Sequence, residues 1–256
     1  MLAHVGEQQT AGFMLVLARI SPLFVIAPLF SSKLITMRAR AVVAVAIAIG
    51  LSPLALKGHK IPLETFALGG LIVKEIMVGL AFSFAIAALF AAVSVAGSFL
   101  DTIVGFSYGS LVDPVTGTQS PVLAQTYSMV GVMVFIAIGG DAWMVRGLAE
   151  TYHLVPLLSM PDLAAMTAGA QHAFSGVFVA ALELAAPVML ALIITDAGFG
   201  VVSRVVPQLN VFAVGFPAKI LVGIALIGAS LPFAAGWIGD ELQQSVRAAL
   251  QSLRIA

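Results

Sequence analysis

The stretch Phe66–Val104, FALGGLIVKEIMVGLAFSFAIAALFAAVSVAGSFLDTIV, is almost continuously apolar over 39 residues. As a single α-helix it would extend for about 60 Å, which is about twice the thickness of the hydrocarbon core of a bilayer. The adjacent charges Lys74 and Glu75, the small residues of Ser94–Ser98, and Asp101 interrupt it. We therefore expect either a helical hairpin or one helix that extends beyond the lipid.

Apolar stretches of similar character fill most of the remaining chain. They are Phe13–Phe30, Ala41–Leu56, Val122–Val145, Phe174–Val206 and Val211–Ile238. Of the 256 residues, 61% are hydrophobic and 9% are charged, whereas a soluble domain carries about 25% charged residues. Lipid or a large protein partner must cover much of this surface, so we expect an all-α, membrane-associated fold.

Six prolines lie inside the apolar stretches and predict bent helices. They are Pro22, Pro28, Pro53, Pro187, Pro217 and Pro232. Each proline removes a backbone donor and tends to kink a helix, and in a membrane the freed carbonyl needs a protein or water partner. This number of breaks favours bent helical hairpins packed within a larger assembly.

The segment Ala41–Leu56 carries basic residues on both sides, with Arg38 and Arg40 before it and Lys57 and Lys60 after it. A single crossing would place basic loops on both faces of the membrane, against the usual asymmetry of Lys and Arg. We therefore expect a re-entrant segment or one that does not fully cross.

The sequence lacks the residues that several classes of function require. It has no cysteine and a formal net charge of zero, and its four histidines never stand four residues apart. These features argue against thiolate or paired-histidine metal sites and against nucleic-acid binding. Phosphate-binding, serine-nucleophile and zinc-protease motifs are also missing from the sequence, which predicts a protein without cofactor, metal or enzymatic activity.

Six charges lie within the apolar stretches, and we expect them to be buried. They are Arg19, Lys74, Glu75, Asp101, Glu183 and Asp196. A charge at the bilayer centre costs about 2.5–3.5 kcal/mol. They either line an ion or proton path or pair between helices or subunits. Pairing is favoured, because a relay needs converging carboxylates that this spacing does not show.

The segment Gly105–Pro121, GFSYGSLVDPVTGTQSP, is a polar insertion between two apolar stretches. Irregular backbone of this composition cannot lie against lipid, so it is either an exposed connecting loop or an element that lines a pore. The candidate residues are Gly105, Phe106, Ser107, Tyr108, Gly109, Ser110, Leu111, Val112, Asp113, Pro114, Gly117 and Pro121.

The segment Arg204–Ile220, RVVPQLNVFAVGFPAKI, predicts a tight helical hairpin. Pro207 ends one helix, Asn210 caps the next, and Pro217 kinks it shortly before Lys219. A plain interhelical turn is the alternative to a functional tip. The candidate residues are Arg204, Pro207, Gln208, Asn210, Phe212, Pro217 and Lys219.

The run PQLNVFAVGFPAKI in this hairpin resembles the signature of the FliR family of flagellar biosynthesis, which has counterparts in virulence type III secretion. Weaker matches extend over about residues 11–240, although the family often has His where this chain has Asp141. The matching positions are Ala18–Ile20 with Pro22, Lys74 and Glu75 with Gly79, Asp113 and Pro114, Ser120–Leu123, Gly140–Arg146 and His153–Pro156.

The resemblance implies a non-enzymatic subunit of the flagellar export gate in the bacterial inner membrane, within the flagellar basal body. Its partners would be FliP and FliQ, with FlhB and FlhA nearby, membrane lipid, and unfolded flagellar proteins in transit. Residues 1–171 would be FliP-like and residues 172–256 FliQ-like. The polar loop would project into the channel and help to close it, and the hairpin would face the cytoplasmic entrance.

A secondary transporter of a small solute or ion is the alternative function. Broken helices, charges at membrane depth and a polar interior loop are typical of such proteins. Transporters usually also contain internal repeats, and the two halves of this sequence show no convincing similarity.

Overall fold

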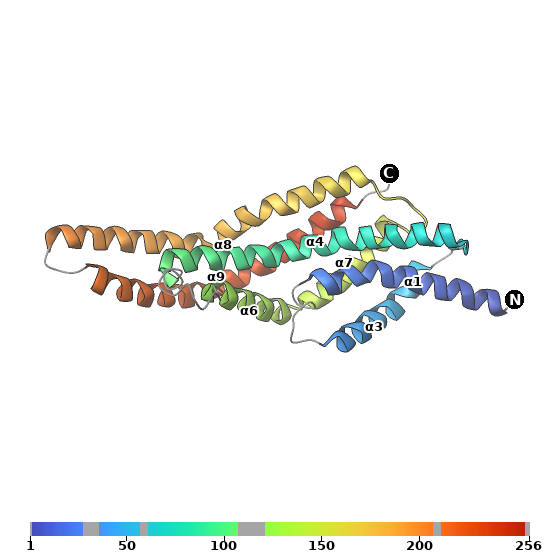
Figure 1. The fold of residues 1–256 in the computed structure, drawn as a ribbon, viewed down its shortest axis with the longest axis horizontal. Helices are drawn as coiled ribbons and strands as arrows, with labels where there is room; N and C mark the ends of the chain where they lie inside the picture. Colours follow the sequence, from blue (N-terminus) through green and yellow to red (C-terminus); the bar gives the residue numbers. More distant parts are fainter. Residues whose placement is uncertain (1, 28–35, 57–60, 107–120, 207–210, 254–256) are drawn as a thin grey trace, which may run out of the picture. The chain divides into compact units, whose positions relative to one another are not determined.

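The computed structural model describes residues 2–27, 36–56, 61–106, 121–206 and 211–253. These residues form seven helices and no strand, which confirms the all-α expectation (Figure 1). In chain order the helices are α1 (Leu2–Ile26), α3 (Met37–Ala55), α4 (Thr65–Val104), α6 (Val122–Ala137), α7 (Gly140–Leu154), α8 (Leu163–Val205) and α9 (Val211–Ser252).

The chain divides into two compact units, and α4, α8 and α9 each contribute to both. The first unit comprises Met1–Ala88, Gly139–Ser175 and Glu241–Ala256, and the second comprises Leu89–Ile138 and Gly176–Asp240. The predicted division near Gln171 concerns sequence resemblance and stays a prediction.

In the first unit, α1 and the beginning of α4 pack with α3, α7 and the end of α9 around buried apolar side chains. Gly147 of α7 lies at one close approach, because a Cβ added there would lie 2.8 Å from Phe82 and 3.0 Å from Val246. The amide of Gln8 also bonds both the N–H and the C=O of Ile61, each at 2.8 Å, and so ties α1 to the chain before α4.

The second unit has its own core, built where the end of α4 meets α6, α8 and α9. The apolar stripe that α8 contributes recurs at helical spacing and comprises Ala181, Leu184, Ala185, Val188 and Leu192. It packs with α4 residues such as Leu100, and with Ile227 and Ile238 of α9.

The apolar stretch that opened the sequence analysis forms the single uninterrupted helix α4 of 40 residues. The hairpin alternative is therefore wrong, and the long-helix alternative holds. The physical reason lies in its glycines, because Gly79 and Gly97 stand at close helix contacts and make no turn.

Prolines occur inside helices as expected, at Pro22, Pro53, Pro187, Pro217 and Pro232, whereas Pro28 lies outside the described residues. The helix expected over Ala41–Leu56 begins earlier, at Met37, because the Thr36 side chain accepts a hydrogen bond from Ala39 N and caps it. The helical path is interrupted between α6 and α7 at Gly139, where the φ of 70° is a conformation that favours glycine.

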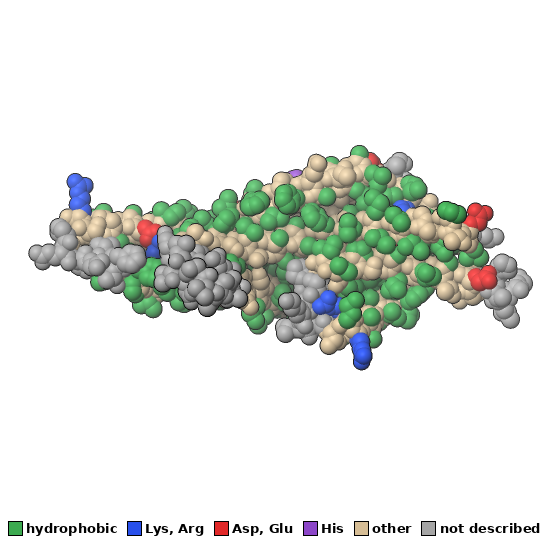
Figure 2. Space-filling model, viewed as in Figure 1, with side chains coloured by type: hydrophobic (Ala, Val, Ile, Leu, Met, Phe, Trp, Pro, Cys, Tyr) green, Lys and Arg blue, Asp and Glu red, His purple; other side chains and the backbone are tan. Residues whose placement is uncertain are grey.

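Five described helices, α1, α3, α4, α8 and α9, are long and apolar enough to cross a membrane, and α6 with α7 could form a sixth, broken span. Large apolar side chains are exposed on all of these helices. Figure 2 shows hydrophobic side chains over much of the visible surface and charged side chains at only a few places. The exposed surface thus has the composition of one covered by lipid or protein.

Candidate functional site: a buried charge cluster and a charged hairpin

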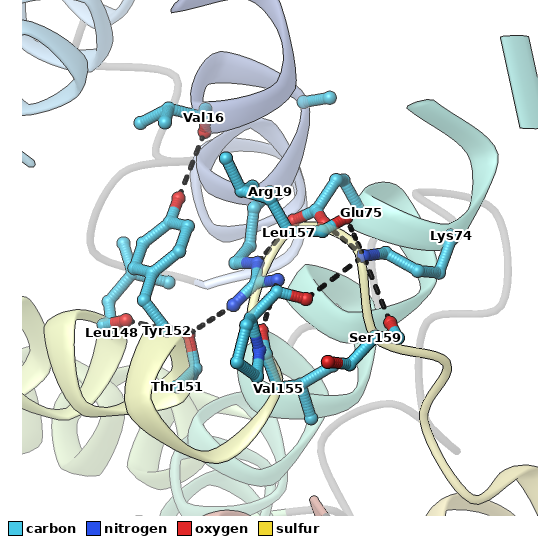
Figure 3. Close-up of polar contacts among 12 residues, drawn as sticks. Val16, Arg19, Lys74, Glu75, Leu148, Thr151, Tyr152, Val155, Leu157 and Ser159 are labelled. Carbon is cyan, nitrogen blue, oxygen red and sulfur yellow. Dashed lines mark hydrogen bonds and ion pairs between the residues drawn. The ribbon is translucent and has the colours of Figure 1, made fainter. Parts of the chain in front are cut away.

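The first unit contains a cluster of three charged side chains between α1 and α4 (Figure 3). Arg19 and Glu75 are fully buried and Lys74 is 5% exposed. Arg19 donates from Nε to Oε2 of Glu75, and Lys74 Nζ lies 2.6 Å from Oε1 of the same carboxylate. One carboxylate therefore serves two cations.

The Arg19 guanidinium also reaches the end of α7. Its Nη1 donates to Thr151 Oγ1 at 3.2 Å and its Nη2 to the carbonyl of Val155 at 2.8 Å. Its Cζ lies 4.1 Å from the ring centroid of Tyr152, a cation–π arrangement. Arg19 thus joins α1, α4 and α7 at one buried point.

Lys74 fixes the chain that follows α7. Its Nζ donates to the carbonyls of Leu157 at 2.6 Å, Ser159 at 3.2 Å and Pro156 at 3.4 Å. The cluster holds two positive charges and one negative charge. These carbonyls and the negative end of the α7 dipole offset the remaining positive charge.

Gly79 permits the close approach of α1 and α4 that this cluster requires. It lies one helical turn after Glu75, and a Cβ added there would collide with the backbone oxygen of Arg19. The sequence pattern of Lys74, Glu75 and Gly79 therefore has a physical basis, since the glycine brings Arg19 within reach of Glu75.

The six charged side chains expected to be buried differ in their burial and in their partners. Arg19 and Lys74 pair with Glu75, as the pairing interpretation favoured, while Asp101 is buried in the second unit. Glu183 and Asp196 lie on α8 outside its buried stripe and are exposed in this chain, so its own helices do not bury them.

Asp196 and Lys219 instead form an ion pair between α8 and α9, with Oδ2 and Nζ 2.6 Å apart and 47% and 18% of the side chains exposed. Sequence reasoning did not pair these two residues. A signal was present, because they stand twelve residues before and eleven residues after Gln208, near the middle of the turn of the predicted hairpin.

The other hairpin candidates divide between described and undescribed positions. Arg204 is exposed in the last turn of α8, and Pro217 lies within α9. Pro207, Gln208 and Asn210, and the side chain of Phe212, lie outside the described residues. The α8 and α9 ends at Val205 and Val211 agree with the predicted positions of the turn.

The ends of the polar loop are described, and its middle is not. Gly105 and Phe106 follow α4 and Pro121 precedes α6, but Ser107, Tyr108, Gly109, Ser110, Leu111, Val112, Asp113, Pro114 and Gly117 lie outside the described residues. Among the described residues no group of His, Cys, Asp and Glu could hold a metal ion.

Sequence reasoning missed the residues that complete the buried cluster. Thr151 and Tyr152 lie on α7, and the carbonyls at Val155, Leu157 and Ser159 follow it. Main-chain carbonyls leave no mark on the sequence. The only available signal was an excess of buried cations over carboxylates near Glu75.

Comparison with known proteins shows similarity over most of the chain. The family model described as bacterial export proteins, family 1, matches residues 10–245. The flagellar biosynthetic protein FliR of Escherichia coli K12 is 31% identical over 219 residues, covering 86% of this chain and 84% of the relative.

Similar relatives occur in other bacteria and in a second system. FliR of Bacillus subtilis is 31% identical over 222 residues, covering 84% of each chain. The surface presentation of antigens protein SpaR of Salmonella typhimurium is 28% identical over 250 residues, covering 96% of this chain and 90% of the relative. The resemblance to the FliR family is thereby confirmed, and the chain belongs to the bacterial export proteins, family 1.

Proposed function

We propose that this chain is a subunit of the flagellar type III export gate, which forms and closes the channel through which unfolded flagellar proteins leave the cell. The observation that carries the proposal is the family match over residues 10–245, together with relatives named for flagellar biosynthesis. These relatives do not favour the alternative of a small-solute transporter.

The partners would be other gate subunits, FliP and FliQ, with FlhB and FlhA at the entrance, in the inner membrane at the flagellar basal body. The exposed apolar side chains support an assembled state, since a surface of this composition needs lipid or protein cover. Residues 1–171 would take FliP-like positions and residues 172–256 FliQ-like positions in that assembly.

The subunit would act without catalysis, as a shaped part of a conduit. Three of the charges within the apolar stretches, those of Arg19, Lys74 and Glu75, bond to one another and to the α7 end, which suits a structural role. The exposed pair of Asp196 and Lys219 lies on the hairpin that we assign to the entrance.

The polar loop Gly105–Pro121 would close the channel in the absence of substrate. Its support is its composition, because an irregular polar segment between apolar helices must lie against water or protein. It connects α4 and α6, which approach each other closely at Gly97.

Deletion of residues 110–118 tests this closing role. We expect gates that carry the deletion to assemble normally and to raise the conductance of the cell membrane to small solutes, because the channel loses its plug. Conductance equal to that of the intact gate, at equal amounts of assembled complex, would contradict the closing role.

A further inference from the structure

The second unit contains a close antiparallel pairing of the end of α4 with α6. The rings of Phe90 and Phe135 lie 5.3 Å apart between centroids. Nearer the loop, a Cβ added at Gly97 would lie 2.5 Å from the Cα of Ala124 and 2.8 Å from the carbonyl oxygen of Leu123. The two backbones are therefore nearly in contact at Gly97 and Ala124, which lie on either side of residues 107–120 along the chain.

The α4 helix has a well-defined C-terminal end at Gly105. Gly105 has a φ of 104°, a conformation that favours glycine, and its N–H donates to the carbonyl of Asp101 at 3.1 Å. The α4 helix thus stops at a defined residue.

The beginning of α6 has no cap of its own. Its N-cap residue is Pro121, which makes no side-chain cap hydrogen bond because proline has no polar side-chain atom. Helices usually begin at Ser, Thr, Asp or Asn, whose side-chain oxygen accepts one of the first free N–H groups. A partner from elsewhere is needed for these N–H groups.

Asp101 of the neighbouring helix α4 supplies the missing cap at the beginning of α6. Its Oδ1 accepts from Leu123 N at 3.1 Å, and the residue is 2% exposed. A buried carboxylate at the positive end of a helix is favourable on both hydrogen-bonding and dipole grounds. An ordinary cap links neighbours in sequence, whereas this one links positions 22 residues apart.

We propose that Asp101 is a positioning residue that ties the end of α4 to the beginning of α6, and so fixes the two points from which residues 107–120 extend. Any consequence for channel leakage rests on the closing role proposed above. The tie itself concerns described residues alone and can be measured separately.

The test must separate a tie between helices from simple capping of α6. Asp101→Ala removes both, and Asp101→Asn keeps an oxygen acceptor at the same place. Asp101→Ala combined with Pro121→Ser restores a local cap through the serine hydroxyl but not the link to α4. Asp162→Ala is the matched control, since Asp162 Oδ1 caps α8 locally, at 2.8 Å from Ala164 N and 3.1 Å from Ala165 N.

The first measurement is the distance between spin labels at Thr102→Cys and Val122→Cys, in the gate complex assembled with cysteine-free partners. Both positions are exposed, and the chain has no native cysteine. We expect one narrow distance in the wild type, in Asp101→Asn and in Asp162→Ala, and a distribution at least about twofold broader in both Asp101→Ala variants. A narrow distance in the Pro121→Ser double variant would overturn the tie.

The second measurement is membrane conductance of the same variants beside the 110–118 deletion. We expect Asp101→Ala, with or without Pro121→Ser, to leak more than the wild type and less than the deletion, and Asp162→Ala to stay at the wild-type level. If the deletion leaks and neither Asp101→Ala variant does, Asp101 does not position the loop. If the deletion does not leak, the closing role fails, and the spin-label distances alone decide whether the tie exists.

Discussion

Glu75 is the carboxylate that lies between the two buried cations Arg19 and Lys74 in the first unit. Glu75→Ala leaves Arg19 and Lys74 without their counter-charge, and breaking a buried ion pair costs about 3–5 kcal/mol. We expect a loss of that size in the free energy of unfolding of the detergent-solubilised gate, measured by chemical denaturation.

The matched control is Asp196→Ala, which breaks the ion pair with Lys219 on the exposed side of the hairpin. Exposed pairs contribute less than about 1 kcal/mol, so this variant should denature close to the wild type. Equal losses in the two variants would mean that the cluster around Glu75 does not stabilise the fold in the way the geometry indicates.

At the scale of helices, Gly79 decides how closely α1 approaches α4. Gly79→Ala places a methyl group against the Arg19 backbone, which cannot rotate away, and we expect a loss of about 1–3 kcal/mol in the free energy of unfolding. The displacement also separates Arg19 from Glu75, so this loss should overlap with that of Glu75→Ala in a double-mutant cycle.

Gly70→Ala is the control on the same helix, because nothing lies within 4 Å of the added methyl group. Alanine favours helix over glycine by about 0.5–1 kcal/mol, so this variant should be unchanged or slightly more stable. A Gly79→Ala variant as stable as Gly70→Ala would show that the α1–α4 approach is not fixed by the glycine.

The helices themselves could be predicted from the sequence, since apolar length and helical spacing are local signals. The choice between one helix and a hairpin over Phe66–Val104 could not be predicted. In the sequence alone, Gly79 and Gly97 fit a helix break and a close helix contact equally well. Pairing around Lys74 and Glu75 was foreseeable from the cost of isolated charges. The α7 end and the Asp101 cap depend on partners distant in sequence, and no local pattern reports them.

For the whole molecule, the decisive property is an exposed surface that is largely apolar on every potential membrane-crossing helix. A helix as long as α4 or α8, at about 60 Å, exceeds a bilayer core by about twofold. Part of each helix must then lie beyond the hydrocarbon layer, where exposed apolar residues need protein cover. This is the physical expectation for a subunit of a larger assembly.

Purification after co-expression with the FliP and FliQ subunits of the same bacterium tests the proposed gate assembly most directly. We expect an affinity tag on this chain to recover both partners in one stable complex in mild detergent, with a mass well above that of the chain. Recovery of this chain as a stable monomer, from cells in which both partners are present in the membrane, would contradict the assignment to the export gate.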